Sequence, residues 1–296
     1  SDPDIYAVGD AVETNHFITG EKALVPLAGP ANKQGRIAAD NICGRESYYH
    51  GAQGSSVLKL FDMTAAATGL SEKAAAAAGL SYDKVVTFSA SHAAYYPGAS
   101  NMTIKTVFDK ESGKILGAQI VGFDGVDKRI DVIAAAIRAG MAGEDLEELE
   151  LAYAPPFSSA KDPVNMAGYV IENVRHGLVR QYHWHDVKDL PRDGSAILLD
   201  TRTPSEYERK HIEGTVNISL DELRGRIGEL DRSKPVYVNC FSGLRSYIAC
   251  RILSGYGFTC YNLSGGFRFY DIVTSDEGFD SRPKHACGVE IGAAGE

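Results

Sequence analysis

The residues best suited to chemistry in this sequence form a short loop that begins with a cysteine. An apolar, strand-like run at 236–238 precedes the loop, and a helix-like run at 247–253 follows it. The loop has the pattern C-x-x-G-x-R and consists of Cys240, Phe241, Ser242, Gly243, Leu244 and Arg245, with Ser246 next in the chain. Backbone N–H groups in such a loop, together with a helix start, stabilise a thiolate or a bound anion. Because the thiolate is the nucleophilic form of cysteine, we interpret Cys240 as a nucleophile.

The alternative for a single cysteine is burial as a small apolar side chain. We assign this packing role to Cys43, Cys250 and Cys260, and neither Cys250 nor Cys260 has a glycine loop around it. Cys250 falls inside the helix that follows the Cys240 loop, and Cys260 falls in the apolar run at 258–263. Cys43 is expected at a helix end and is not expected to have a redox function.

The segment from Trp184 to Tyr270 resembles the rhodanese sulfurtransferases. The resemblance is carried by the Cys240 loop and by four further stretches, Leu199–Arg202, Glu206–Tyr207, His211–Ile218 and Gly265–Phe267. It implies that Cys240 carries a persulfide and passes the outer sulfur to an acceptor. The four residues between Cys240 and Arg245 favour sulfur chemistry, because the related phosphatase loops are one residue longer.

Three charged residues are expected near this loop. The guanidinium of Arg245 is suited to neutralising thiosulfate or a persulfide donor. Asp200 and Arg202 are expected near the mouth of the loop, where Arg202 could assist an anionic sulfur donor. For Asp200 a structural pairing between strand end and loop is the favoured interpretation.

The overall composition limits the class of protein. The chain has 296 residues, enough for about two domains, and 30 basic against 39 acidic residues leave a net charge of −9. The sequence has no dense Lys/Arg block of the kind that would indicate nucleic acid as a partner. It also has no long apolar run or signal pattern that would indicate a membrane protein or a secreted protein. The five cysteines fit neither a disulfide framework nor a zinc site, and His183 and His185 lack a third ligand. We expect a cytoplasmic protein without a metal.

The first part of the chain resembles the end of the FAD-binding domain of pyridine nucleotide-disulfide oxidoreductases. Its apolar run Ile5–Val8 is expected to form a strand that ends in Gly9 and Asp10, and a helix is expected to start after Pro26. The resemblance implies that Asp10 binds the flavin ribityl chain and that the backbone of Leu27 and Ala28 lies near the flavin pyrimidine ring. Because no G-x-G-x-x-G loop occurs in the sequence, we expect an incomplete FAD site and a chain that is part of a longer protein.

The middle of the chain has the pattern of an α+β meander. Strands are expected at 85–90, 102–109 and 115–122, with a turn at 110–113. A helix at 74–78 is expected to be capped by Ser71. Another helix is expected to carry Ile130, Ile133, Ile137 and Met141 on one face. The prolines between 153 and 165 predict a rigid, extended loop.

This middle part resembles the dimerisation domain of the same superfamily, most closely in the coenzyme A-disulfide reductase branch with a fused rhodanese domain. The resemblance implies a homodimer in which Tyr95 and Tyr153 reach the partner's active site, with Tyr96 as an alternative to Tyr95. It also implies NAD(P)H and coenzyme A for the full-length protein, and disulfide, persulfide or thiosulfate substrates. The NADH site and the reductase cysteine are not found in this sequence.

The expected architecture is a multidomain α/β and α+β protein. We place an FAD-domain remnant at 1–56, a dimerisation domain at 57–178, an α/β rhodanese domain at 184–275 and a flexible tail at 276–296. The alternative function is a non-catalytic module that dimerises and docks a sulfur carrier. Formation of a persulfide at Cys240 separates the two functions.

Overall fold

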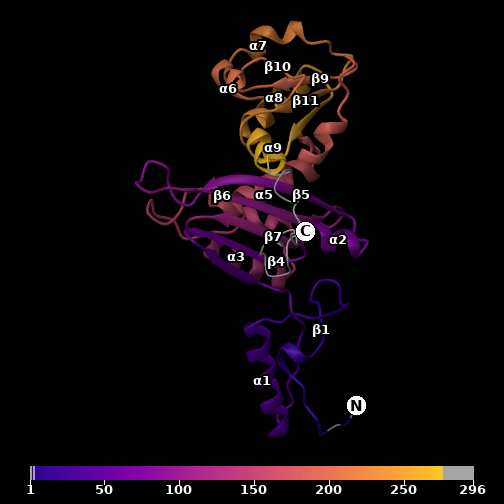
Figure 1. Ribbon diagram of the computed structural model, residues 1–296, viewed down its shortest axis with the longest axis vertical. Helices are drawn as coiled ribbons and strands as arrows, with labels where there is room; N and C mark the ends of the chain where they lie inside the picture. The colour runs from indigo at the N-terminus through magenta and orange to yellow at the C-terminus, as the bar shows by residue number, and fades with distance from the viewer. Residues whose placement is uncertain (1, 3, 276–296) are drawn as a thin grey trace, which may run out of the picture. The chain divides into compact units, whose positions relative to one another are not determined.

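The computed structural model describes residue 2 and residues 4–275, and the expected tail lies outside them. The chain divides into two compact units, one up to Arg175 and one from His176 onward, which are described separately. The first unit contains a short N-terminal segment and an antiparallel sheet, and the second contains a parallel sheet (Figure 1).

The N-terminal segment contains little sheet. Its elements are the 3-10 helix η1 (Gly9–Ala11), the paired strands β1 (Thr14–Asn15) and β2 (Lys22–Ala23), and the helix α1 (Ala28–Ile42). The strand expected at Ile5–Val8 is wrong, because this stretch pairs with no strand among the described residues and its side chains are exposed. An extended segment becomes a strand only where a neighbour accepts its backbone hydrogen bonds.

The main sheet of the first unit has five antiparallel strands in the order β3-β4-β7-β6-β5. The strands are β3 (Ser56–Leu60), β4 (Met63–Gly69), β5 (Tyr82–Ala90), β6 (Asn101–Asp109) and β7 (Ile115–Gly122). The last three confirm the expected meander, whereas the β3–β4 hairpin was not expected. Helix α2 (Glu72–Ala77) lies between β4 and β5, and the Ser71 side chain accepts a hydrogen bond from the Ala74 N–H, as expected of an N-cap.

Three helices follow the sheet, α3 (Val126–Ala139), α4 (Gly143–Glu147) and α5 (Pro163–Arg175). The expected apolar face of α3 is confirmed for Ile130, Ile133 and Ile137, which are buried in one core with residues of the sheet and α5. Met141 lies beyond the end of α3, because the helix stops at Gly140 in the left-handed conformation. The predicted extended loop is wrong at its end, since Pro163 is the first residue of α5.

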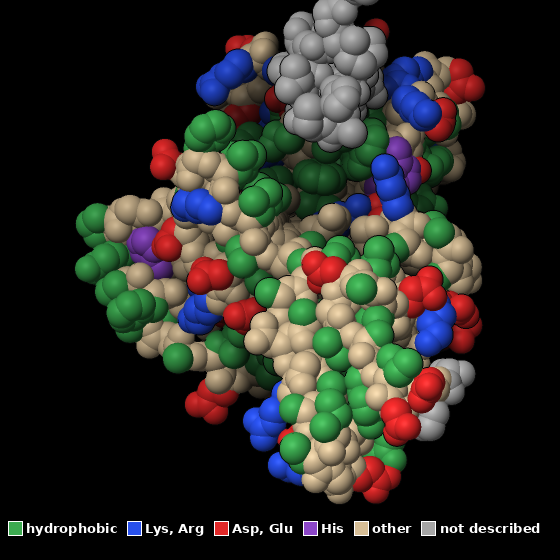
Figure 2. All heavy atoms as spheres, turned by 60° about the horizontal axis from the view of Figure 1, so that its bottom comes forward, with side chains coloured by type: hydrophobic (Ala, Val, Ile, Leu, Met, Phe, Trp, Pro, Cys, Tyr) green, Lys and Arg blue, Asp and Glu red, His purple; other side chains and the backbone are tan. Residues whose placement is uncertain are grey.

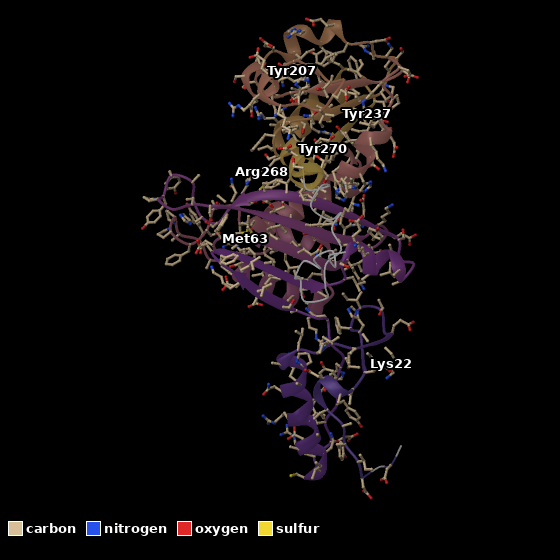
Figure 3. All side chains as sticks on the ribbon, viewed as in Figure 1. Lys22, Met63, Tyr207, Tyr237, Arg268 and Tyr270 are labelled. Carbon is tan, nitrogen blue, oxygen red and sulfur yellow. The ribbon has the colours of Figure 1, made fainter. Side chains whose placement is uncertain are left out.

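The second unit contains a five-stranded parallel sheet in the order β10-β9-β11-β12-β8. Its strands are β8 (Arg180–Tyr182), β9 (Ile197–Asp200), β10 (Val216–Asn217), β11 (Val236–Asn239) and β12 (Cys260–Leu263). The helical elements are η2 (Trp184–Asp189), α6 (Pro204–Arg209), α7 (Leu223–Arg226), η3 (Ile227–Glu229), α8 (Leu244–Gly255) and α9 (Gly266–Ser275). The sheet thus includes β8, which precedes the expected domain start at 184. Tyr237 and Tyr270 pack against one of its cores (Figure 3).

Candidate active site

The nucleophile candidate Cys240 lies at the carboxyl end of the central strand β11, directly before the loop that leads into α8. In parallel sheets this edge is where ligands bind, because the strand ends and helix starts meet there. The backbone N–H of Gly243 donates to the sulfur at 3.2 Å. The Ser246 hydroxyl lies 3.2 Å from the sulfur and also 3.2 Å from the Gly243 carbonyl oxygen. The expected group of backbone donors is thus, among the described contacts, one backbone N–H and one side-chain hydroxyl.

Two glycines allow the loop to close over the sulfur. Gly243, the N-cap of α8, has a φ of 104°, which a side chain would strain. Gly266 lies against the loop, and a Cβ atom there would come within 2.7 Å of the carbonyl oxygens of Cys240 and Phe241. The first N–H groups of α9 then hold the loop, with Phe267 N donating to Cys240 O at 2.7 Å and Arg268 N donating to Phe241 O at 2.8 Å. The Gly265–Phe267 stretch therefore acts on the loop from the start of α9.

The Cys240 side chain is 1% exposed, whereas two loop residues beside it reach solvent. Phe241 is 42% exposed and Leu244 is 60% exposed, so the loop has an apolar rim. Ser242 belongs to the same turn and is only partly buried. Cys240 itself is thus shielded behind an exposed apolar rim.

Arg245 lies beside the loop, but its charge is engaged by a carboxylate. Both terminal guanidinium nitrogens donate to the two Glu206 carboxylate oxygens at 2.8 Å. The hydrogen bonds from Arg245, assisted by Thr203, lower the pKa of Glu206 to about 2 although burial opposes the shift. The sequence predicted Arg245 as a partner for an anionic donor, and the structure adds the Glu206 carboxylate that pairs with it. Glu206 is held in place because it is also the third residue of α6, in a capping box with Thr203.

Asp200 and Arg202 form a buried ion pair near the loop. The Arg202 guanidinium contacts the Asp200 carboxylate at 2.7 Å and 3.0 Å, and it also donates to the Lys210 carbonyl oxygen. Its other face lies on the Phe267 ring, 4.1 Å from the centroid. Because both residues of the pair are almost fully buried, the Arg202 guanidinium has no open side for an anionic donor. The geometry favours the structural interpretation of Asp200.

In the first unit, the two predicted tyrosines meet. The hydroxyl groups of Tyr95 and Tyr153 lie 3.0 Å apart although 58 positions separate them in sequence. Both rings are exposed, and the hydrogen bond to Tyr95 raises the pKa of Tyr153. The alternative residue, Tyr96, packs its ring edge-on against His92 at 5.8 Å. In the space-filling view of Figure 2, side chains coloured as hydrophobic, a class that includes tyrosine, gather on the projection at the left.

Arg129, which the sequence did not single out, positions both tyrosine-bearing loops. It is 1% exposed and donates to the Asp162 carboxylate at 3.0 Å and 3.2 Å. It also donates to the carbonyl oxygens of Ser91 and Phe157, which lie in the two loops. Beside these loops is a cavity of about 670 Å³ lined by Tyr153, Lys128, Phe157, Arg129 and their neighbours. The contacts of Arg129 therefore fix the two loops that carry the tyrosines, and Tyr153 borders a cavity that could hold a ligand.

The three residues predicted to bind flavin lie at one end of α1. Asp10 is exposed in η1, and the neighbouring Gly9 packs against Ala31 in the first turn of α1. Leu27 is the extended N-cap of α1, and no side chain caps the helix there. The Leu27 N–H donates to the Val25 carbonyl oxygen at 2.8 Å, so the N–H groups of Ala28 and Gly29 are the ones available as donors, next to an exposed carboxylate. This donor set fits a group with hydroxyls and a ring carbonyl, as a flavin has.

The remaining described cysteines divide into two kinds. Cys250 and Cys260 are buried, as expected, but they lie together beside a cavity. Cys43 lies at the expected helix end, but the prediction that it packs as a small apolar side chain is wrong, because it is exposed.

Within the described residues no group of three or more His, Cys, Asp or Glu side chains is arranged to hold a metal ion. In the same part of the chain, no helix combines the length and the apolar character that crossing a membrane requires.

Two segments of the chain match known protein families. Residues 55–163 match the pyridine nucleotide-disulphide oxidoreductase dimerisation domain, and residues 183–270 match the rhodanese-like domain. The chain is 39% identical to the NAD(P)H coenzyme A polysulfide/persulfide reductase of Pyrococcus horikoshii over 168 residues, covering 57% of this chain and 38% of the relative. It is also 39% identical to the coenzyme A disulfide reductase of Staphylococcus epidermidis over 168 residues, covering 56% of this chain and 38% of the relative.

Two solved structures resemble nearly the whole chain. The reduced CoADR-RHD of Bacillus anthracis has a TM-score of 0.90 and 48% identity, covering 93% of this chain and 49% of that chain. The NAD-dependent persulfide reductase from A. fulgidus has a TM-score of 0.83 and 42% identity, covering 91% and 48%. The chain thus spans less than half of the length of each of these four relatives. The predicted resemblance and the α/β and α+β fold class are confirmed.

Proposed function

We propose that this chain belongs to an FAD-dependent NAD(P)H reductase of coenzyme A disulfides or persulfides, and that it supplies the dimerisation and sulfurtransferase parts. The observation that carries the sulfurtransferase part is the Cys240 loop, in which the Gly243 N–H and the Ser246 hydroxyl both reach the sulfur at 3.2 Å. In this proposal residues 1–56 contribute to the FAD site, residues 57–178 to dimerisation and residues 184–275 to sulfur transfer. The names of the four relatives support the reductase part.

The proposed reaction at Cys240 is the transfer of one sulfur atom. The Cys240 thiolate attacks the outer sulfur of a persulfide donor, the donor S–S bond breaks, and the donor leaves as a thiolate that takes up a proton. With thiosulfate as donor the leaving group is sulfite. The persulfide that forms on Cys240 is anionic, and the donors that stabilise the thiolate also stabilise it. An acceptor thiolate then attacks the outer sulfur and frees Cys240.

The test of this reaction is the mass of the protein after incubation with thiosulfate or a low-molecular-weight persulfide. One added sulfur is expected on the tryptic peptide that ends at Arg245, which contains Cys240. Cys240→Ser should not gain sulfur, whereas Cys43→Ser is a matched control for an exposed thiol and should behave as the parent. If Cys240→Ser gains sulfur as readily as the parent, Cys240 is not the carrier. Absence of a persulfide on Cys240 of the parent would favour the docking module.

The proposed partner of the first unit is a second copy of this chain. The outer strand β3 is exposed along its whole length, and Val57, Leu58, Leu60 and Phe61 leave apolar surface in solvent. Several large apolar side chains exposed within one short segment indicate a protein interface. Homodimerisation would cover it and would bring Tyr95 and Tyr153 to the partner's reductase site. A monomer in sedimentation at high micromolar concentration would contradict the proposal.

The proposed flavin contacts are the Asp10 carboxylate on the ribityl hydroxyls and the N–H groups near Leu27 and Ala28 on the pyrimidine ring. When bound, FAD would accept a hydride from NAD(P)H. The residues of this chain contribute binding and orientation at one end of the group. The expected result is weak or no FAD binding by this chain alone, and retention of FAD by a chain extended toward the N-terminus, with Asp10→Ala lowering the retained flavin absorbance. Stoichiometric FAD on this chain alone would overturn the proposal of an incomplete site.

A further inference from the structure

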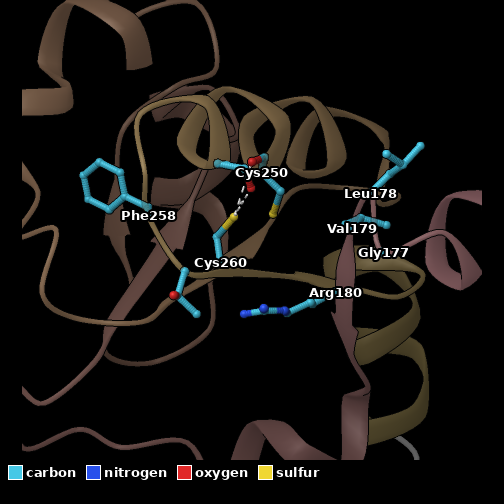
Figure 4. Close-up of a pocket in the computed structure, with 9 residues that line it drawn as sticks. Gly177, Leu178, Val179, Arg180, Cys250, Phe258 and Cys260 are labelled. Carbon is cyan, nitrogen blue, oxygen red and sulfur yellow. Dashed lines mark hydrogen bonds between the residues drawn. The ribbon is translucent and has the colours of Figure 1, made fainter.

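Two buried cysteines of the second unit face one another away from the Cys240 loop. Cys250 lies in α8 and Cys260 begins β12, and α8 packs on β12. The Cys260 sulfur lies 3.3 Å from the Cys250 carbonyl oxygen and 3.3 Å from the Ser254 hydroxyl oxygen (Figure 4). Both side chains line the same cavity, and their sulfur atoms lie next to each other in Figure 4. Buried cysteines that serve only as packing need no such contact.

A cavity that is open to solvent borders this pair. Its volume is about 160 Å³, and its lining includes Cys250, Cys260, Ser254, Phe258 and Arg180. Arg180 is an exposed residue of β8, and its side chain extends along the cavity below Cys260 (Figure 4). A cavity with a cation at its side favours a reagent that carries a negative charge.

The two thiols differ in acidity. The hydrogen bond from Cys250 lowers the pKa of Cys260 to about 7 against the effect of burial, and Ser254 and Arg180 add to the lowering. The hydrogen bond to Cys260 and burial raise the pKa of Cys250 well above its ordinary value. The thiolate is the attacking form in thiol–disulfide exchange. Cys260 is also the more exposed of the two, at 6% against 1%, and the Ser254 hydroxyl lies beside its sulfur. Exposure, contacts and acidity thus all point to Cys260 as the attacking sulfur and to Cys250 as the resolving one.

We propose that Cys250 and Cys260 form a second sulfur site, a redox-active dithiol that is oxidised by low-molecular-weight disulfides carrying a negative charge. The Cys260 thiolate attacks one sulfur of the disulfide, a mixed disulfide forms, and the other half leaves as a thiolate. The Cys250 thiol then loses its proton and attacks Cys260, which releases the second half and forms the Cys250–Cys260 disulfide. The reagent is reduced to two thiols while the two cysteines lose two electrons and two protons.

The sequence makes this proposal directly testable by peptide mapping. Trypsin cleaves after Arg245, Arg251 and Arg268, so Cys250 lies in the peptide 246–251 and Cys260 in the peptide 252–268. The probes are oxidised glutathione, which is anionic, and bis(2-hydroxyethyl) disulfide, which is uncharged. With oxidised glutathione we expect a disulfide that joins the two peptides. Cys250→Ser should stop at a glutathione adduct on Cys260, and Cys260→Ser should leave Cys250 unmodified.

Cys43, on a separate tryptic peptide, is the internal control for an exposed thiol. Modification of Cys43 without the joined peptides, in protein with parental circular dichroism, would overturn the proposal. Equal reaction of Cys250 in Cys260→Ser would overturn the assigned order of attack. Arg180→Gln should slow the reaction with oxidised glutathione about fivefold, as expected for one partly exposed charge, and should not slow the reaction with the uncharged probe. Equal rates with glutathione in Arg180→Gln and the parent would refute the preference for anionic reagents.

Discussion

Replacing Ser246 by alanine tests whether the Cys240 loop stabilises negative charge on sulfur. The Ser246 side chain is fully buried, and its hydroxyl lies 3.2 Å from the Cys240 sulfur. The change removes one donor and leaves the other, the Gly243 N–H, in place. The loop backbone should keep its shape, because Phe267 and Arg268 hold it from α9.

The expected size of the effect follows from the kind of bond that is lost. A hydrogen bond to a charged group contributes about 1.5 to 3 kcal/mol, and sulfur is a weak acceptor, so we take the lower end, about 1.5 kcal/mol. That free energy corresponds to about a tenfold loss of rate. Ser246→Ala should therefore form the Cys240 persulfide about ten times more slowly than the parent, without abolishing the reaction.

The assay is the rate of thiocyanate formation from thiosulfate and cyanide, with the Cys240 peptide followed by mass in parallel. Ser233→Ala is the matched control, because Ser233 is exposed and its hydroxyl donates to Asp231 before the start of β11, at the end of the strand opposite to the loop. Thermal unfolding of both variants separates loss of the sulfur contact from loss of packing. A Ser246→Ala rate within a factor of two of the parent, in a folded protein, would refute the stabilisation by this hydroxyl.

The Cys240 loop could be predicted because its information is local. Strand, cysteine, glycine and helix follow one another within about twenty residues, so the positions at β11 and α8 needed no knowledge of distant contacts. The same holds for the Ser71 cap of α2 and for the meander of β5, β6 and β7. Alternation, turn residues and caps act over a few positions, and the sequence displays them directly.

The partners of the site residues could not be predicted, because they are distant in sequence. Glu206 lies 39 positions before Arg245, and Arg129 binds Asp162 across 33 positions. Nothing in a local pattern distinguishes a guanidinium that is free to bind a donor from one that a remote carboxylate neutralises. The sequence therefore located Arg245 but not the carboxylate that pairs with it.

The local errors have local physical causes. Proline at the first position of a helix costs no hydrogen bond, and the Asp162 carboxylate accepts from the Val164 N–H, so the prolyl segment begins α5 rather than extending the loop. The β3–β4 hairpin was missed because β4 is rich in alanine, a weak strand former, and all of β3 is exposed. A strand without a buried face gives no alternating pattern.

Three further changes test the structure. Arg129→Met should lower the free energy of unfolding by about 3 to 5 kcal/mol in urea titrations, because it leaves a buried carboxylate unpaired; a loss below about 1 kcal/mol would contradict the positioning role of Arg129. Phe61→Asn should weaken the homodimer at least about tenfold in sedimentation equilibrium without unfolding the chain, because Phe61 is 92% exposed and has a φ of 52°, which asparagine tolerates; an unchanged dimer would place the interface elsewhere. Glu206→Gln should raise kcat/KM for thiosulfate about fivefold, because it frees the charge of Arg245 for the donor, with Glu229→Gln as the control in an exposed pair on Arg226. The pKa of Glu206 is lowered to about 2, so the pair stabilises the parent above the unfolded pKa of about 4.3 and that stability is lost as the pH falls toward 2. The free energy of unfolding of Glu206→Gln should therefore depend less on pH between 4.5 and 2 than that of the parent. Thiosulfate rates and acid unfolding equal to those of the parent would show that Glu206 does not withhold the charge of Arg245 from the donor.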